Sequence, residues 1–312
     1  MTGVLPARDR ADTATQLTLF GAPLDLGSAF RGSGGGPAAL RAGGLAEALR
    51  RAGWDVIDAG DVVPASAIVG AKIDGCSSLT EVTAACRAVR DESSAALKAG
   101  RLPLLLGGDH SLAIGSIAAA SAHAARAGRP FFVLWLDAHA DFNLPETSPS
   151  GCVFGMPVAV VSGEGHPSLL ALGHATPIVD VRNIALLGVR SVDPLEVPRV
   201  RDRGLRVHGM EAIRRHGMAA LALQALERPM REGAHIHVSF DLDVLDPEEA
   251  PGVGLPEADG ATIEETQACL EAVMKTGLVG SFDLMEHNPS ADPGGGTTRR
   301  VIELMSRALT RR

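Results

Sequence analysis

Residues 131–141 read Phe-Phe-Val-Leu-Trp-Leu-Asp-Ala-His-Ala-Asp, an apolar run followed at once by three side chains of metal-binding types. The first six residues are apolar at every position, which favours a strand buried on both faces. Helices on both sides of a parallel sheet bury strands in this way. Ligands of such sheets bind beyond the carboxyl ends of the strands. The stretch therefore predicts a ligand site that contains Asp137, His139 and Asp141.

Short apolar runs of the same kind alternate with alanine-rich helical stretches along the rest of the chain. Besides 131–136, we expect strands at 17–21, 54–59, 103–106, 184–189, 205–208, 236–240 and 279–283. We expect helices near 38–51, 79–99, 111–127, 211–231, 262–275 and 298–310. This alternation predicts an α/β sandwich around a mostly parallel sheet of about eight strands.

The composition is that of a compact layered enzyme, with 46% hydrophobic residues, 21% charged residues and 36 glycines among 312 residues. The formal net charge of -8 argues against nucleic acid or an anionic membrane as a partner. Residues 1–16 lack the apolar core of a secretory signal, and we expect them to form a flexible leader. We expect residues 17–312 to form a single domain. The four scattered cysteines are typical of reduced thiols in a cytoplasmic protein.

Metal-binding side chains follow three of the expected strands. They occur in Gly-Gly-Asp-His-Ser at 107–111, in Asp-Ala-His-Ala-Asp at 137–141 and in Asp-Leu-Asp at 241–243. Residues two apart in an extended segment point the same way, so the polar side chains of a cluster can converge. Converging carboxylates repel one another unless cations neutralise them. An aspartate at a strand end can instead cap the next helix, but three such clusters favour metal binding.

Four carboxylates and two imidazoles are the candidate ligands: His110, Asp137, His139, Asp141, Asp241 and Asp243. Such a set suits two divalent ions, and its many oxygen atoms favour manganese over zinc. Paired ions of this kind turn a bridging water into a nucleophile near neutral pH. We therefore expect two Mn²⁺ ions as cofactors.

The three motifs resemble the metal motifs of the ureohydrolase family, which includes arginase and agmatinase. The resemblance implies a three-layer α/β/α sandwich, a binuclear manganese centre, and homotrimers or homohexamers. The ligands that it implies for the more exposed ion are His110, Asp137, Asp141 and Asp241. The other ion would share these three aspartates and add His139 and Asp243.

Within this family, the segments that would hold the amino-acid end of a substrate resemble those of arginase. The loop after residue 142 resembles the arginase loop around the substrate α-carboxylate, which implicates Asn143, Ser148 and Ser150. The segment after the 184–189 strand resembles the one that meets the α-amino group, which implicates Asp193, with Glu196 as a support. The resemblance therefore predicts an arginine-like amino acid as the substrate.

The guanidinium end is expected at Glu286, which resembles the family carboxylate that pairs with this group. A planar cation suits a carboxylate held at a fixed angle. Asp141 and Glu286 are the expected catalytic residues of a hydrolase that acts on C–N bonds of linear amidines. Asp109 is expected to orient a metal ligand from behind.

Three substitutions depart from the arginase pattern. Phe154 stands where the family has a histidine that shuttles protons, and phenylalanine carries no proton. Cys152 replaces an amide near the amino-acid end, and Leu255 replaces a threonine hydroxyl beside the guanidinium. Three other histidines, His166, His174 and His287, are more typical of a solvated surface than of a replacement shuttle.

Three interpretations of these departures are open. The protein is an arginase that works without the shuttle, since the metal ligands and Glu286 are present. Alternatively, Phe154 and Leu255 pack against the substituent of an N-hydroxylated or N-methylated arginine, or the pocket takes another guanidino compound such as agmatine or a guanidino acid. In the third interpretation the chain binds metal and ligand without turnover. Six intact ligand positions favour an enzyme that produces ornithine and urea or a substituted urea.

Overall fold

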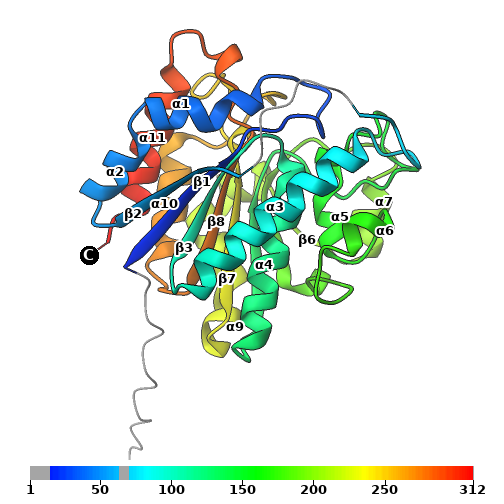
Figure 1. Cartoon of the computed structure of the whole chain (residues 1–312), viewed down its shortest axis with the longest axis horizontal. Helices are drawn as coiled ribbons and strands as arrows, with labels where there is room; N and C mark the ends of the chain where they lie inside the picture. Colours follow the sequence, from blue (N-terminus) through cyan, green and yellow to red (C-terminus); the bar gives the residue numbers. More distant parts are fainter. Residues whose placement is uncertain (1–14, 63–69, 312) are drawn as a thin grey trace, which may run out of the picture.

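A parallel sheet forms the centre of the computed structural model, which describes residues 15–62 and 70–311 (Figure 1). Within these residues the sheet has eight strands in the order β2-β1-β3-β8-β7-β4-β5-β6, and every paired neighbour is parallel. The strands are β1 (Gln16–Ala22), β2 (Asp55–Asp61), β3 (Leu102–Gly107), β4 (Phe131–Leu136), β5 (Ile184–Val189), β6 (Arg206–Gly209), β7 (His235–Asp241) and β8 (Val279–Met285). Each expected strand is present, and the predicted α/β sheet is confirmed.

Helices cover both faces of the sheet, as Figure 1 shows. The helices are α1 (Gly36–Ala42), α2 (Leu45–Arg51), α3 (Leu79–Lys98), α4 (Ala113–Arg126), α5 (Pro157–Val161), α6 (Pro167–Leu170), α7 (Val197–Asp202), α8 (Met210–His216), α9 (Met218–Glu232), α10 (Ile263–Met274) and α11 (Gly296–Ala308). Strand β4 shows why both faces must be covered: Leu134 packs in the core that includes α9 and α10, and Trp135 packs against α4. The three-layer arrangement follows from strands that are apolar on both faces.

Two of the expected helices are each divided in the structure. The helix expected at 38–51 is α1 followed by α2, and the break falls at Gly44, which has a φ of 90°. The helix expected at 211–231 is α8 followed by α9, separated by Gly217 with a φ of 83°. Glycine adopts positive φ without the steric cost of a Cβ atom, so each glycine ends one helix and turns the chain into the next.

The amino-terminal boundary also differs from the expectation. Strand β1 begins at Gln16, one residue inside the segment predicted as a leader, and residues 1–14 lie outside the described part of the chain.

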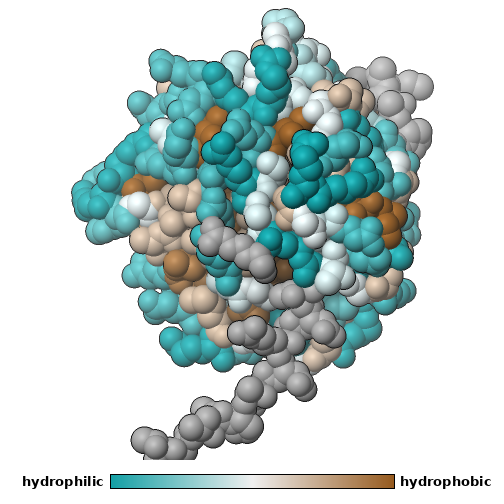
Figure 2. Space-filling view, turned by 90° about the vertical axis from the view of Figure 1, so that its left-hand side faces the viewer, coloured by the Kyte–Doolittle hydropathy of each residue, from teal (hydrophilic) through white to brown (hydrophobic). Residues whose placement is uncertain are grey.

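Figure 2 shows that hydrophilic side chains cover most of one face of the molecule, and hydrophobic residues on that face form separate patches. No helix among the described residues is long and apolar enough to cross a membrane.

The clusters identified in the sequence meet at one edge of the sheet. Strands β3, β8, β7 and β4 are adjacent, and the residues that follow their carboxyl ends carry the candidate ligands and Glu286. This edge is where open parallel sheets bind ligands, because loops from neighbouring strands diverge there. The sheet order therefore brings together side chains that lie far apart in the sequence.

Candidate metal centre and active site

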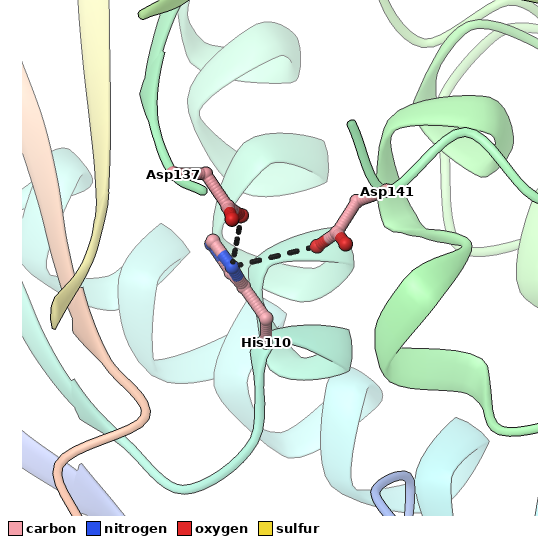
Figure 3. Close-up of side chains that lie close together, drawn as sticks. All are labelled: His110, Asp137 and Asp141. Atoms are coloured by element: carbon pink, nitrogen blue, oxygen red, sulfur yellow. Dashed lines mark ion pairs between the residues drawn. The ribbon is translucent and has the colours of Figure 1, made fainter. Parts of the chain in front are cut away.

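His110 lies at the centre of a buried cluster of carboxylates (Figure 3). Its Nδ1 atom is 2.9 Å from a carboxylate oxygen of Asp241, 3.1 Å from Asp137 and 3.5 Å from Asp141. Its Nε2 atom is 2.9 Å from the Ser239 hydroxyl. The ring stacks on Trp135 with centroids 4.0 Å apart. These contacts fix the ring and direct Nδ1 toward the carboxylates.

A second group forms around His139. Its Nδ1 atom is 2.9 Å from an oxygen of Asp243 and 3.4 Å from Asp137. Asp137 therefore contacts both imidazoles, one with each oxygen, and the oxygen that faces His110 also accepts a hydrogen bond of 2.8 Å from the Trp135 indole. The two groups, His110 with Asp137 and Asp141, and Asp137 with His139 and Asp243, each place ligand atoms close enough to hold one ion.

The carboxylates converge through turns rather than through extended backbone. Asp141 has a φ of 49°, so the segment after β4 does not continue as a strand. Asp241 begins the 3-10 helix η5 (Leu242–Val244), and its side chain accepts a hydrogen bond of 2.8 Å from the Asp243 amide. The side chains therefore meet, as the sequence predicts, but turns bring them together and alternation along an extended strand does not. Asp241 also shows that capping and facing the site are compatible roles.

The relative exposure of the two histidines also differs from the expectation. The His110 side chain is 1% exposed and the His139 side chain is 17% exposed, so the group expected to be more open is the more buried. Trp135 and Ser239 cover His110, whereas His139 lies at the pocket. The sequence did not predict this difference because it depends on which side chains pack behind each imidazole.

The electrostatics of the cluster fit divalent cations. Burial, reinforced by neighbouring carboxylates, raises the pKa of both Asp141 and Asp241 well above the usual range. The His110 Nδ1 atom is buried and has no hydrogen-bond partner. Clustered carboxylates and an imidazole nitrogen that faces them without a hydrogen bond are a donor set that a cation would satisfy. His110, Asp137, His139, Asp141, Asp241 and Asp243 therefore fit two ions.

Glu286 reaches the same site from the end of β8. Its side chain is 5% exposed, and one carboxylate oxygen accepts a hydrogen bond of 2.9 Å from the His110 amide. Burial, then the charges of Asp241 and Asp109, raise its pKa well above the usual range. Its φ is 61°, so Glu286 shares with Asp141 a left-handed backbone that residues other than glycine seldom adopt. Such conformations cluster at functional sites.

A pocket opens over the cluster and has about 270 Å³ of empty space, part of it open to solvent. The lining residues are Ser28, Phe30, His139, Asp141, Phe154, Asp241, Asp243, Gly254, Leu255 and Glu286. The metal-binding groups and Glu286 make it acidic, whereas Phe30, Phe154 and Leu255 supply apolar surface. Phe154 and Leu255, which depart from the family pattern, therefore line the same pocket as the candidate ligands.

The residues expected at the amino-acid end lie outside this lining but close to one another. The Asn143 side-chain amide donates a hydrogen bond of 2.8 Å to Asp193. Glu196 is buried and accepts hydrogen bonds from the amides of Phe142 (2.6 Å) and Asp193 (3.2 Å). Glu196 thus holds the backbone next to Asp141 and Asp193, which is a supporting position.

The serines of the same loop stabilise its turns. The Ser148 hydroxyl accepts from the Gly151 amide at 2.9 Å, and the Ser150 hydroxyl accepts from the Cys152 amide at 3.1 Å. Cys152 is buried and free. The structure therefore gives these serines backbone partners within the loop and places Cys152 beneath it.

Other polar residues considered from the sequence do not line the pocket. His174 is exposed, as expected of a surface histidine, and His166 contacts Ser168 (2.8 Å) and Asp74 (3.3 Å). The same expectation is wrong for His287, which is buried and contacts Thr298 (2.9 Å). Asp109 accepts hydrogen bonds from the amides of Gly27 (2.8 Å) and Ser111 (3.1 Å), so it fixes the turn before His110. None of these histidines lines the pocket.

Three residues near the site were not predicted from the sequence. Ser28 and Phe30 follow β1, whose carboxyl end lies at the same sheet edge, but their types carry no metal-binding signal. Glu257 lies in the long loop after β7 and approaches His139 to 3.6 Å. The β1 loop could have been predicted to contribute, because parallel sheets bind ligands beyond the carboxyl ends of their strands. The position of Glu257 depends on how the long loop after β7 folds.

A two-ion donor set at the carboxyl edge of a parallel α/β sheet defines the chain as a candidate metal-dependent hydrolase. A sequence model of the Arginase family matches residues 15–310. An arginase of Brucella melitensis is 39% identical over 94% of this chain and 95% of its own length. The crystal structure of the arginase from Bacillus caldovelox superimposes with a TM-score of 0.88, at 34% identity, and covers 95% of this chain and 99% of that chain.

A third relative adds a bound molecule to the comparison. The Entamoeba histolytica arginase, described in complex with L-ornithine, has a TM-score of 0.87 at 26% identity and covers 95% of this chain and 98% of its own. The chain belongs to the arginase family and is a hydrolase that acts on C–N bonds of linear amidines.

Proposed function

We propose that the protein is a binuclear manganese amidinohydrolase that cleaves the guanidino group of arginine or of an N-substituted arginine. The products are ornithine and urea, or ornithine and a substituted urea. One observation carries the proposal: Glu286 and four of the six candidate ligands line one acidic pocket at the carboxyl edge of the sheet, and the other two, His110 and Asp137, cluster with them. The similarity to arginases supports arginine as the parent substrate.

The cofactor assignment follows from the donors. Two Mn²⁺ ions, one held near His110 and one near His139, would lower the pKa of a water molecule and make it nucleophilic near neutral pH. Oxygen donors outnumber nitrogen donors in this set, which favours manganese over zinc. We also propose that the protein forms homotrimers or homohexamers, as the family resemblance implies, and that it is cytoplasmic, as its four scattered cysteines suggest.

The chain's own residues orient the substrate. Glu286 pairs with the guanidinium, and its carboxylate is held in place by the His110 amide. Asn143 and Asp193, joined at 2.8 Å, receive the α-carboxylate and the α-amino group with Ser148 and Ser150. Asp141 accepts the proton that the attacking water loses and returns it to the leaving ornithine amine. The atoms of water are thereby divided between urea and ornithine.

The apolar wall of the pocket supports an N-substituted arginine as a substrate. Phe154 and Leu255 line the pocket where a histidine and a threonine would offer polar atoms to an unsubstituted guanidinium. A methyl or hydroxyl substituent would bring additional atoms into contact with this wall. Phe154 also removes a proton carrier, so proton transfer falls to Asp141 alone.

A substrate panel tests the proposal. Manganese-loaded protein is incubated with arginine, N-hydroxyarginine, N-methylarginine, agmatine and guanidinobutyrate, and the amine product is measured. We expect ornithine from at least one of the three amino acids. Product from agmatine or guanidinobutyrate alone would replace the substrate with another guanidino compound. Stoichiometric metal without any product would show a binding protein.

A further inference from the structure

The two ring nitrogens of His139 have different surroundings. Nδ1 faces the carboxylates of Asp243 and Asp137 at 2.9 and 3.4 Å. Nε2 is buried and has no hydrogen-bond partner. The Oε1 atom of Glu257 lies 3.6 Å from this nitrogen, just beyond hydrogen-bond distance. A carboxylate therefore stands on the side of the imidazole away from the candidate metal ligands.

The backbone around Glu257 is tied to the backbone of Asp243. The Arg190 guanidinium donates hydrogen bonds to the carbonyl oxygen of Asp243 at 2.7 Å and to that of Glu257 at 2.8 Å. It donates another, of 2.9 Å, to the carbonyl of Ala258. One side chain thus fixes the distance between the segment that supplies a ligand and the segment that supplies Glu257. The approach of Glu257 to His139 is consequently set by the fold.

A metal-binding imidazole must be neutral, and the nitrogen that faces the metal must carry the lone pair. The proton then lies on the other nitrogen, and an acceptor for it fixes the tautomer and the ring orientation. The Glu257 side chain is 33% exposed, so a small rotation can bring its carboxylate from 3.6 Å into hydrogen-bond distance. No side chain in the described part of the protein forms a hydrogen bond with Nε2, so this nitrogen is open to an acceptor.

We infer that Glu257 is a positioning residue for the metal centre: it accepts the Nε2 proton of His139 and keeps Nδ1 available for an ion. The inference rests on the metal centre of the proposed function, but not on the substrate. Glu257 acts through His139 and touches neither substrate nor ion. It should matter for the ion at Asp137, His139 and Asp243 and leave the ion at His110 unaffected.

Titration of metal-stripped protein with Mn²⁺ tests this inference, with bound metal counted after equilibrium dialysis. Glu257→Ala should weaken the binding of one of two ions by roughly 10- to 100-fold and leave the other unchanged. Glu257→Gln keeps an acceptor oxygen and should lose less affinity. Glu248→Ala, an exposed glutamate of the same loop, is the control and should bind both ions as the unmodified protein does.

A double-mutant cycle identifies the route. In the His139→Asn background, Glu257→Ala should have no further effect on Mn²⁺ affinity, because the group on which Glu257 acts is gone. Unchanged affinity in Glu257→Ala, or equal loss with and without His139, would overturn the inference. Two ions bound without hydrolysis of any guanidino compound would instead refute the proposed function and leave this inference standing.

Discussion

The inner end of the pocket and its outer wall are built in opposite ways. The inner end consists of carboxylates and imidazoles that follow β3, β4 and β7, are mostly buried, and are held by hydrogen bonds such as that of the Trp135 indole to Asp137. The outer wall consists of Phe30, Phe154 and Leu255 from three separate loops. We therefore expect the inner end to determine the reaction and the outer wall to determine which substrate reacts.

The difference has a physical origin. Each inner carboxylate is constrained by charge, because moving it would leave a buried neighbour unpaired. The outer wall consists of apolar side chains without charged groups, and Phe154 is joined to the β1 loop by a backbone hydrogen bond of 3.1 Å, from its amide to the carbonyl of Gly27. A side chain that makes only van der Waals contacts can change without breaking a charge pair. Substitutions in the two regions should therefore have different consequences.

The largest effect is expected from Asp137→Ala, because Asp137 contacts both imidazoles. Its removal should abolish stoichiometric manganese binding and lower kcat for the best substrate by on the order of 10³-fold, since several kcal/mol of charge stabilisation are lost. Metal analysis and initial rates measure both quantities. Asp202→Ala, an exposed aspartate on α7, is the control. Full metal binding in Asp137→Ala would show that Asp137 is not needed to hold the ions and that the inner end is not constrained by charge.

Glu196 holds the backbone beside Asp141 and Asp193, and its effect on the free energy of unfolding should depend on pH. Burial raises the pKa of Glu196 to about 7, although two backbone amides oppose this. Since the unfolded value is about 4.3, the folded protein binds this proton more tightly. The contribution to stability is complete below the unfolded pKa and is lost as pH rises through about 7.

The free energy of unfolding of the unmodified protein should therefore fall between pH 5 and pH 8, relative to Glu196→Gln. The difference should be on the order of 3 kcal/mol. Urea unfolding of both proteins at the two pH values measures it. Identical pH slopes would show that Glu196 keeps an ordinary pKa in the folded protein.

Phe154→His tests the outer wall directly. Histidine restores a proton carrier and a polar surface, so kcat/KM for arginine should rise and that for N-methylarginine should fall, with the ratio changing roughly tenfold. Leu255→Thr is the matched variant from another loop and should change the ratio in the same direction. Unchanged values for both substrates in Phe154→His would mean that Phe154 does not set the preference.

The sequence predicted the inner end better than the outer wall, for physical reasons. Apolar strands and acidic clusters leave a strong local pattern, so the eight strands and the position of Asp137 beyond β4 were predicted correctly. The breaks at Gly44 and Gly217 depend on single backbone conformations within otherwise helical stretches. The left-handed backbone of Asp141 could not be predicted, because residues other than glycine seldom adopt it and nothing in the local sequence marks it. Loop residues are placed only by the complete fold.

The smallest effect is expected at Phe30, because it is the least buried residue of the outer wall. Phe30 is 41% exposed while lining the pocket, so it contributes only part of its surface to a bound substituent. Phe30→Ser should therefore lower kcat/KM for N-methylarginine by roughly threefold and leave that for arginine nearly unchanged, since less than about 1 kcal/mol of contact is lost. Metal content should stay at the unmodified level, which separates this change from Asp137→Ala. An equal loss for both substrates would show that Phe30 orders the pocket as a whole, and the separation between a reacting inner end and a selecting outer wall would then have to be redrawn to include the β1 loop.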